Sequence, residues 1–279
     1  MSKKAPALVL GGGELGSAIA YYLRKSFIPV AIALEPQELY LRRSICFAEA
    51  AFTGRKQIDD IRGLLITEED LDRAPSRNFD ARWREAVSFH IQNRDIPIFL
   101  TGELPSFLEI LQPAVFIRTL PGAGSGISLE SADFVIGLHP NHIAGTDCHV
   151  AVDAGLSYRT GDVYLSKPQF GPDFDIHLFK KPFNEVLSPL DGLFVSSRDI
   201  GQQIQHHDSL GSVEGIEIRS PYTGQLWGIF HSGRLVSARQ PLALIYEGPP
   251  NEGYAHFGFW HKCVAGAVLA EVERFSKSF

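Results

Sequence analysis

The residues with the clearest potential for chemistry lie in the stretch HPNHIAGTDCHVAVDAG, residues 139–155. If residues 147–153 form a strand, Asp147, His149 and Asp153 share one face, because side chains alternate along a strand. Two carboxylates and an imidazole on one surface can shuttle protons or bind a metal ion. An edge strand with one wet face would show the same pattern. We take the three residues as catalytic candidates and assign no metal ligands.

A second feature is a glycine turn near the start of the chain. The apolar run Ala7–Leu10 leads into Gly11, Gly13 and Gly16, and an amphipathic segment follows over residues 14–25. Strand, glycine turn and helix together are typical of a dinucleotide-binding fold. Gly11 allows the tight turn, Gly13 lets a pyrophosphate approach the backbone, and Gly16 lets the helix pack close to its strand. The helix N-terminus offers free N–H groups to phosphates.

Three charged residues after the next apolar run fit the same interpretation. The run Val30–Leu34 ends at Glu35, close to where a dinucleotide fold places the acid that binds a ribose. Arg42 and Arg43 follow, and two adjacent guanidinium groups can bind a phosphate or an acidic ligand. A solvated helix face or a salt bridge explains the two arginines equally well. A Rossmann scaffold that no longer binds a nucleotide is the alternative for the whole turn.

The elements that must position these residues form an α/β domain. Short apolar runs separated by helical or glycine-rich pieces indicate a parallel sheet covered on both faces. The expected strands after residue 35 are 62–67, 96–100, 114–117 and 133–138, and residues 79–93 read as a surface helix. We therefore expect a Rossmann-like nucleotide-binding domain over residues 1–140 and connecting strands and a loop over 141–185.

The region from residue 186 to 248 has a different pattern. Ser188-Pro189 returns as Ser220-Pro221, and further pairs of glycines and aliphatic residues recur at the same offset. A repeat of short strands and glycine turns indicates two interlocked β-halves. The pattern resembles the barrel-sandwich hybrid of biotinyl and lipoyl domains. No lysine occurs between Pro182 and His261, so biotin or lipoate attachment is excluded, and we expect a structural or docking module.

The last segment, residues 249–279, should contain a helix that packs back on a domain. Apolar residues recur at helical spacing from Phe259 to Phe275, and Gly266 among alanines suggests a close helix contact.

Bulk composition excludes several classes of protein. The chain has 279 residues, a net charge of −6 and 44% hydrophobic residues, which fits a soluble protein and argues against a nucleic-acid or anionic-membrane partner. Three widely spaced cysteines without a C-x-x-C pattern indicate neither a disulfide framework nor a structural zinc site. The N-terminal apolar run is too short for a signal peptide or a membrane span. We expect a cytoplasmic protein, and a homo-oligomer is compatible with this sequence.

Two motifs carry a resemblance to a known family. They are E-x₆-R-R-S-x₂-F-A-E-A, starting at Glu35, and A-G-x-D-x-H, ending at His149. With the glycine turn, the β-repeat and the final AGAVLAEV, they resemble the YqeB-type accessory proteins of selenium-dependent molybdenum hydroxylases. That family is distantly similar to the XdhC-type maturation factors of xanthine and carbon monoxide dehydrogenases.

The resemblance implies a Rossmann-like domain joined to a lipoyl-like barrel, in a protein that helps to mature the molybdenum cofactor of a partner hydroxylase. It assigns the following positions: Gly11, Gly13 and Gly16 to the glycine turn, Glu35, Arg42 and Arg43 to the motif after the second strand, Asp147 and His149 to the D-x-H element, and Asp153 to a position where the family usually has glutamate. The implied ligand is a nucleotide or the molybdopterin dinucleotide. Two alternatives stay open: an NAD(P)-dependent oxidoreductase, suggested by the glycine turn and Glu35 alone, and a non-enzymatic scaffold.

Overall fold

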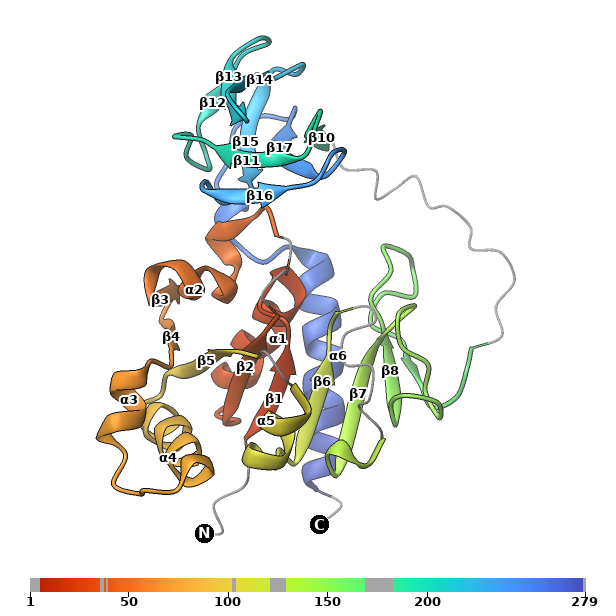
Figure 1. Cartoon of the computed structure of the whole chain (residues 1–279). Helices are drawn as coiled ribbons and strands as arrows, with labels where there is room; N and C mark the ends of the chain where they lie inside the picture. Colours follow the sequence, from red (N-terminus) through yellow and green to blue (C-terminus); the bar gives the residue numbers. More distant parts are fainter. Residues whose placement is uncertain are drawn as a thin grey trace. The chain divides into compact units, whose positions relative to one another are not determined.

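The computed structural model describes residues 6–35, 38, 40–101, 104–120, 129–168 and 183–277 (Figure 1). The chain divides into two compact units. The first, here called the α/β unit, comprises Met1–Glu38, Phe47–Ile176 and Phe257–Phe279; the second, the β-unit, comprises Leu39–Cys46 and His177–His256. The sequence-based boundaries at residues 140, 185 and 248 stay predictions, and residues 169–182 lie outside the described part of the chain.

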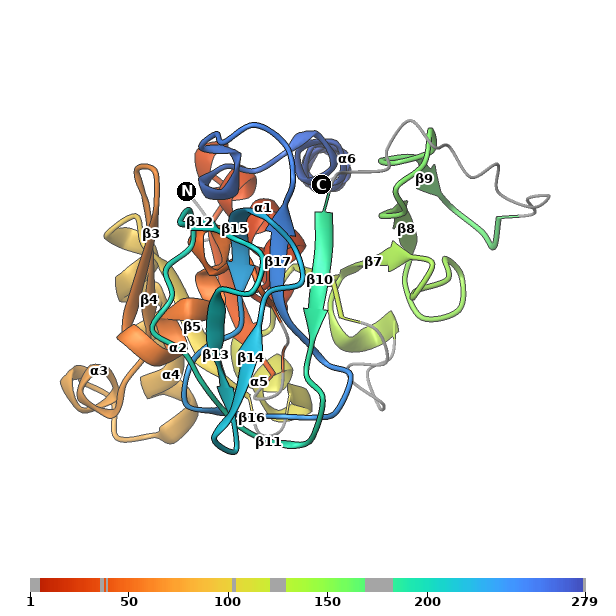
Figure 2. The ribbon, with the colours of Figure 1, turned by 90° about the horizontal axis from the view of Figure 1, so that it is seen from above.

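A mixed sheet forms the centre of the α/β unit. Its described strands run in the order β3-β4-β5-β2-β1-β6-β7-β8-β9, and all neighbours from β4 to β8 are parallel. The edge strands β3 and β9 pair antiparallel, which the expected all-parallel sheet did not include. Figure 2 shows β3 and β4 at one end of this series and β8 and β9 at the other. The strands are β1 (Ala7–Leu10), β2 (Val30–Leu34), β3 (Arg55–Ile58), β4 (Ile61–Leu65), β5 (Ile96–Leu100), β6 (Val115–Arg118), β7 (Phe134–His139), β8 (Val150–Asp153) and β9 (Val163–Tyr164).

The central strands are parallel because their apolar runs can be buried on both faces. Every residue of β1, β2, β6 and β8 is buried, whereas β3 is largely exposed, as an antiparallel edge strand can be. Helices α4 and α5 share one core cluster with Leu8 and Leu10, and α1 packs against α6. The helices are α1 (Glu14–Lys25), α2 (Ala50–Thr53), α3 (Glu68–Arg73), α4 (Phe79–Gln92), α5 (Leu104–Leu111) and α6 (Phe259–Ser276), with 3₁₀ turns at Arg43–Ile45, Phe47–Glu49, Leu129–Ser131 and Gly253–Ala255.

The strand order reverses beside β1, which fixes where a ligand can bind. The chain moves from β1 to β2 on one side and later crosses to β6 on the other side of β1. In open α/β sheets ligands bind outside the carboxyl ends of the strands at such a switch point. The glycine turn follows β1 at this end of the sheet.

The C-terminal helix forms where the sequence predicts it, but the expected role of Gly266 is wrong. Val264 and Val268 of α6 are buried, so the helix does pack back on the α/β unit. A Cβ added at Gly266 would meet no atom within 4 Å, and the residue is exposed. Gly266 therefore makes no close helix contact. No helix in the described part of the chain is long and apolar enough to cross a membrane.

The β-unit consists of two four-stranded antiparallel sheets among the described residues. One has the order β10-β17-β15-β12 and the other β14-β13-β11-β16. Their inner faces share a core that includes Phe194, Leu226 and Ile245. The strands are β10 (Phe183–Leu187), β11 (Gly192–Val195), β12 (Gln203–Ile204), β13 (Ser209–Val213), β14 (Ile216–Arg219), β15 (Gly224–Ile229), β16 (Arg234–Val236) and β17 (Pro241–Tyr246).

The internal repeat of the sequence is a structural repeat with an offset of 32 residues. The Ser188 hydroxyl donates to the carbonyl of Leu190 (2.6 Å), and the Ser220 hydroxyl donates to that of Tyr222 (2.7 Å). Backbone bonds recur in the same way, as Gly201 N bonds Leu226 O and Gly233 N bonds Phe194 O, both at 2.7 Å. At this offset each strand of one sheet corresponds to a strand of the other sheet. The corresponding pairs are β10 and β14, β11 and β15, β12 and β16, and β13 and β17. The two halves are thus interlocked, as the repeat predicts.

Candidate functional site

The glycine turn after β1 has the tight geometry that its residues predict. Gly11 has φ +105°, a conformation that favours glycine, and a Cβ added there would lie 2.4 Å from Thr119 Oγ1. A Cβ at Gly16 would lie 2.0 Å from the carbonyl oxygen of Gly11. Gly16 therefore permits the close approach of α1 to the turn.

A carboxylate that sequence reasoning missed occupies the amides of this turn. Gly12 N donates to Glu38 Oε2 (2.9 Å), and Gly13 N donates to Glu38 Oε1 (2.5 Å). Glu38 is only 9% exposed. The two N–H groups lie where a dinucleotide fold presents donors to a pyrophosphate. The turn therefore binds an oxyanion in this structure, and the oxyanion is a side chain of the chain itself.

The surroundings of Glu38 destabilise the ionised form of its carboxyl group. Burial raises the pKa of this carboxyl to about 7, against the opposing effect of the hydrogen bonds from Gly12 and Gly13. The negative charge of Glu35 raises it further, which means that the predicted ribose acid lies close enough to Glu38 to repel it. Near neutral pH the protonated and ionised forms of Glu38 are both populated.

Hydrogen bonds that do not involve Glu38 also hold the backbone of the turn. The buried Ser17 hydroxyl donates to the carbonyl of Gly12 (2.6 Å) and accepts from Phe47 N (2.7 Å). Ala48 N also donates to the Gly12 carbonyl, at 2.9 Å. The backbone of the turn is therefore fixed by bonds that do not involve Glu38, so removal of the Glu38 carboxylate would leave these bonds in place.

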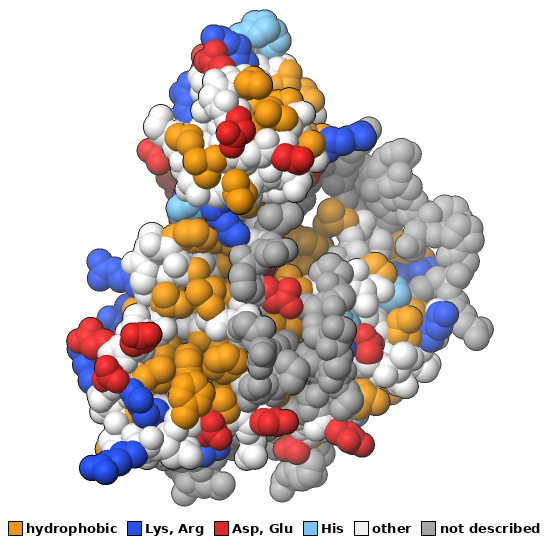
Figure 3. Space-filling model, viewed as in Figure 1, with side chains coloured by type: hydrophobic (Ala, Val, Ile, Leu, Met, Phe, Trp, Pro, Cys, Tyr) orange, Lys and Arg blue, Asp and Glu red, His pale blue; other side chains and the backbone are white. Residues whose placement is uncertain are grey.

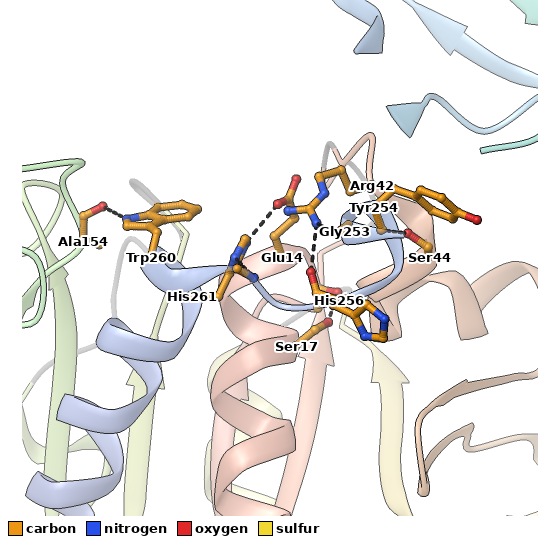
Figure 4. A network of polar contacts seen from close by, with 12 residues as sticks. Glu14, Ser17, Arg42, Ser44, Ala154, Gly253, Tyr254, His256, Trp260 and His261 are labelled. Carbon is orange, nitrogen blue, oxygen red and sulfur yellow. Dashed lines mark hydrogen bonds and ion pairs between the residues drawn. The ribbon is translucent and has the colours of Figure 1, made fainter. Parts of the chain in front are cut away.

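The first residue of α1 is bonded to the first turn of α6. His261 Nε2 lies 2.9 Å from Glu14 Oε2, and Gly258 N donates to His261 Nδ1 at 3.2 Å (Figure 4). Because Nδ1 accepts a hydrogen bond, the ring proton lies on Nε2 and is donated to Glu14. Trp260 Nε1 of the same helix donates to the carbonyl of Ala154 (2.9 Å). His261 has both nitrogens engaged and serves to join α6 to α1.

Arg42 and Arg43 lie in the β-unit, where both guanidinium groups bond backbone carbonyls. Arg42 Nη2 donates to the carbonyls of Gly253 and His256, each at 3.0 Å, and Figure 4 shows these bonds. Arg43 Nε donates to the carbonyl of Ile229 (2.9 Å). The predicted phosphate-binding role of both arginines stays a prediction.

Asp147, whose side chain is 32% exposed, contacts the buried side chains of Arg118, at the end of β6, and His142. Arg118 Nη1 donates to the carbonyl and to Oδ2 of Asp147 (3.0 and 3.4 Å), and His142 Nδ1 lies 2.7 Å from the same Oδ2. His142 Nε2 lies 3.1 Å from the carbonyl of Leu120. The two ring nitrogens of His142 thus connect Asp147 to the carbonyl of Leu120.

The charged neighbours determine the protonation of Asp147. Burial would raise its pKa, but hydrogen bonds from His142 and from Ile143 N, with the charges of His142 and Arg118, hold it below the usual value. Sequence reasoning singled out Asp147 but missed Arg118 as its partner. The i+5 spacing of His142 and Asp147 across a glycine-containing turn was the only available signal.

The described contacts do not join Asp147, His149 and Asp153 into one group. The strand begins only at Val150, so the alternation expected over residues 147–153 is realised over its last four residues. His149 Nδ1 accepts from Val135 N (2.9 Å), while Asp153 accepts from Tyr164 Oη and Gly155 N, both at 2.8 Å. Burial raises the pKa of Tyr164, and the hydrogen bond to Asp153 and the charge of Asp153 raise it further. The described residues contain no group of three His, Cys, Asp or Glu side chains placed to hold a metal ion.

Comparisons with known proteins confirm the resemblance to YqeB. No family model matches the chain. YqeB of Escherichia coli (strain K12), an uncharacterized protein, is 21% identical over 232 residues, which is 82% of this chain and 40% of YqeB. The chain thus spans about two fifths of the length of this curated relative.

Two solved structures align with most of the chain at low similarity. The ectoine utilization protein EutE (DoeB) from Ruegeria pomeroyi has a TM-score of 0.25 and 13% identity, over 88% of this chain and 86% of that one. Succinylglutamatedesuccinylase/aspartoacylase from Rhodobacter sphaeroides has a TM-score of 0.26 and 11% identity, over 89% and 87%. Scores at this level carry no conclusion about fold or activity.

Proposed function

We propose that the chain is an accessory protein of a molybdenum hydroxylase and binds a phosphate-bearing ligand at the glycine turn. The observation that carries the proposal is the pair of amides of Gly12 and Gly13, which converge on one oxyanion at the start of α1. The Glu38 carboxylate stands in for a phosphate of the ligand, because both present two oxygens to two N–H donors. The ligand class is a nucleotide, with the dinucleotide form of the molybdenum cofactor or NAD(P) as the specific candidates.

Binding of the ligand requires that Glu38 leaves the turn. A phosphate of the ligand competes with the Glu38 carboxyl for the two amides. Because burial raises the pKa of Glu38 in the turn to about 7, protonation stabilises the buried side chain, and a rise in pH favours its release into solvent. We therefore infer that Glu38 is an internal competitor and that ligand affinity rises as the pH rises from about 6 to about 8.

The position of the turn in the sheet supports the same site. The turn follows β1, and the Arg118 cluster stands at the end of β6, the adjacent strand across the switch point. Leu10 and Arg118 are register partners on these two strands. A ligand anchored at the turn would extend along this edge, with Glu35 at the end of β2 available to a ribose.

The molybdenum part of the proposal rests on the sequence resemblance. The similarity to YqeB supports that resemblance over most of the chain, and the described β-unit supports a barrel-sandwich hybrid through its two interlocked, repeat-related sheets. A module of that kind without a lysine for a prosthetic group is available for docking to another protein. We assign this role to the β-unit and the ligand to the α/β unit.

A permanently closed scaffold is the second candidate. It is favoured by the occupation of both amides by Glu38, which fills the anion site without any ligand. In that case the glycine turn is a relic of a nucleotide-binding ancestor, and the protein acts through its surfaces alone.

A thermal-shift panel separates the two candidates. Wild type, Glu38→Ala, Gly13→Asp and the control Glu35→Ala are tested with NAD, NADP, CTP, CDP and ATP at about pH 6 and about pH 8. A ligand at a hundred times its dissociation constant adds about 2.7 kcal/mol to stability, which is readily measured. We expect Glu38→Ala to bind about tenfold more tightly than wild type at the lower pH, where protonation holds Glu38 in the turn, and to lose the pH dependence.

The two other variants test the geometry. Gly13→Asp should abolish binding without unfolding the chain, because Gly13 is an N-cap with φ −68°, a position that accepts Asp. Glu35→Ala should weaken the binding of all five nucleotides, because each carries a ribose, and should keep the pH dependence. If no nucleotide stabilises any variant, Glu38→Ala included, the closed scaffold is the correct candidate.

A further inference from the structure

The two sheets of the β-unit have equivalent outer faces, and the described residues cover the central strand of only one of them. Residues that differ by 32 occupy equivalent positions, so Gln225 and Trp227 of β15 correspond to Leu193 and Val195 of β11. Gln225 is 6% and Trp227 7% exposed, whereas Leu193 is 42% and Val195 49% exposed. The two positions on β15 are therefore covered by other residues, whereas the equivalent positions on β11 are exposed.

The covered face shows what such a surface binds. The cover consists of two segments outside the repeat, residues 40–46 and 247–256. The Arg42 guanidinium lies 5.8 Å from the Trp227 ring centre, and the Tyr254 ring lies 6.2 Å from it. Asn251 N donates to Gln225 Oε1 at 3.2 Å. These two segments therefore place the Arg42 guanidinium and the Tyr254 ring beside Trp227 on this outer face.

The equivalent face carries aliphatic side chains in place of these anchors. Leu193 of β11 and Leu235 of β16 are register partners, and Leu235 is 78% exposed. Phe194, between Leu193 and Val195, is fully buried, so the two flanking side chains point outward. Leu193, Val195 and Leu235 define an apolar surface, called here the β11–β16 face. Contiguous exposed apolar side chains of this kind mark interaction sites.

The charges around this face indicate the partner's chemistry. The Glu214 side chain lies against Leu193, whose N–H donates to Glu214 Oε1 (2.6 Å). Glu217 is the register partner of Ser212, which itself pairs with Val195, and Glu217 Oε2 accepts from Arg219 Nη2 at 2.6 Å. Residues 183–256 contain eight Asp and Glu, four Arg and no Lys. Figure 3 shows acidic side chains among the hydrophobic ones on the surface of this unit.

We propose that the β11–β16 face is the docking surface for a partner protein that presents apolar side chains bordered by Lys or Arg. A second copy of the chain is disfavoured as occupant, because residues 183–256 carry more acidic than basic side chains and two such surfaces would repel each other. The proposal rests on the proposed function, since that function names the partner as the molybdenum hydroxylase of the same organism.

The test measures binding of the full chain to the purified molybdenum hydroxylase. The variant Leu193→Ser/Leu235→Ser removes apolar area from the β11–β16 face, and Leu187→Ser, 44% exposed on β10, is the matched control. We expect the double variant to weaken binding at least tenfold at an unchanged melting temperature and the control to leave binding unchanged. Glu214→Lys should also weaken binding and reduce its dependence on salt.

Three results would overturn the proposal. Equal binding by wild type and the double variant would reject the face and leave the proposed function standing. Failure of the wild type to bind the hydroxylase would reject the proposed function and, with it, this occupant. A wild-type dimer that dissociates in the double variant, seen by sedimentation, would show that the face joins two copies of the chain.

Discussion

Glu38 and Asp147 are two carboxylates near the same edge of the sheet, and the structure treats them in opposite ways. Each accepts a hydrogen bond from at least one backbone N–H. Asp147 also contacts the side chains of Arg118 and His142, which lower its pKa. Glu38 is more deeply buried, has Glu35 as a charged neighbour, and its pKa is raised to about 7.

The difference shows which of the two groups can be exchanged. Asp147 contacts two buried side chains that can carry positive charge, so its loss removes the carboxylate that Arg118 and His142 share. Glu38 contributes a charge where the glycine turn offers only partial positive charge from two amides and a helix N-terminus. A ligand phosphate can replace Glu38 there, whereas Asp147 is held by the side chains of Arg118 and His142.

The largest expected effect is the loss of Asp147. Asp147→Ala leaves His142 and Arg118, whose side chains are 1% and 6% exposed, without their common carboxylate. Breaking a buried ion pair in this way costs about 3 to 4 kcal/mol of unfolding free energy. Urea denaturation at neutral pH measures the loss, with the exposed Asp199→Ala as control. A loss below about 1 kcal/mol would mean that Asp147 is no more firmly held than a surface acid.

A nearly equal effect, visible only as a pH dependence, is expected for Glu38. Its pKa rises from the ordinary 4.5 to about 7 on folding, so the folded state binds the proton more tightly. The resulting stabilisation is fully present below pH 4.5 and is lost as the pH rises through 7. Between about pH 5 and about pH 8, wild type should lose up to about 3 kcal/mol relative to Glu38→Ala.

Denaturation of wild type, Glu38→Ala and Glu35→Ala across this range provides the measurement. Glu35→Ala should retain most of the wild-type slope. Asp147, whose pKa is lowered, should act with the opposite sign, because its stabilisation is lost only as the pH falls below its ordinary value of 3.8. Parallel curves for wild type and Glu38→Ala would show that Glu38 is not strained in the turn.

A smaller effect is expected at the brace of the turn. The Ser17 hydroxyl makes two buried bonds, to Gly12 O and from Phe47 N, and Ser17→Ala removes both. The expected loss is about 1 to 2 kcal/mol of unfolding free energy. Ser276→Ala, which removes one partly buried bond to Val272 O in α6, should cost about half a kcal/mol or less. Equal losses would indicate that the turn is held mainly by its glycines.

Local features of the fold were predictable from the sequence because their causes are local. The strands Ala7–Leu10 and Val30–Leu34 and the helix Glu14–Lys25 form where the apolar runs and the glycine turn place them. The repeat at an offset of 32 residues predicted the two interlocked β-halves, because equal spacing produces equivalent turns.

The candidate site was less predictable because tertiary contacts decide it. No pattern near Glu38 indicates that its side chain reaches back to Gly12 and Gly13, 26 and 25 residues earlier. The link between Arg118 and Asp147 spans 29 residues and depends on the packing of the turn before β8 against the end of β6, two strands that are separated by β7 in the sheet. Alternation suggested a strand from residue 147, but the bonds from Asp147 to His142, Arg118 and Ile143 keep that residue in a turn.

The smallest effect concerns reactivity rather than stability, and it reports on how tightly the Asp147 region is closed. Cys148 is fully buried, and burial, with the charge of Asp147, raises its pKa to about 12. A thiol reagent at about pH 8 should therefore modify the partly exposed Cys263 and spare Cys148 in the folded protein. In Asp147→Ala the local structure loosens, and Cys148 should become reactive while Glu38→Ala leaves it protected. Mass spectrometry of the labelled peptides distinguishes the two sites, and equal protection of Cys148 in both variants would show that Asp147 does not hold this region closed.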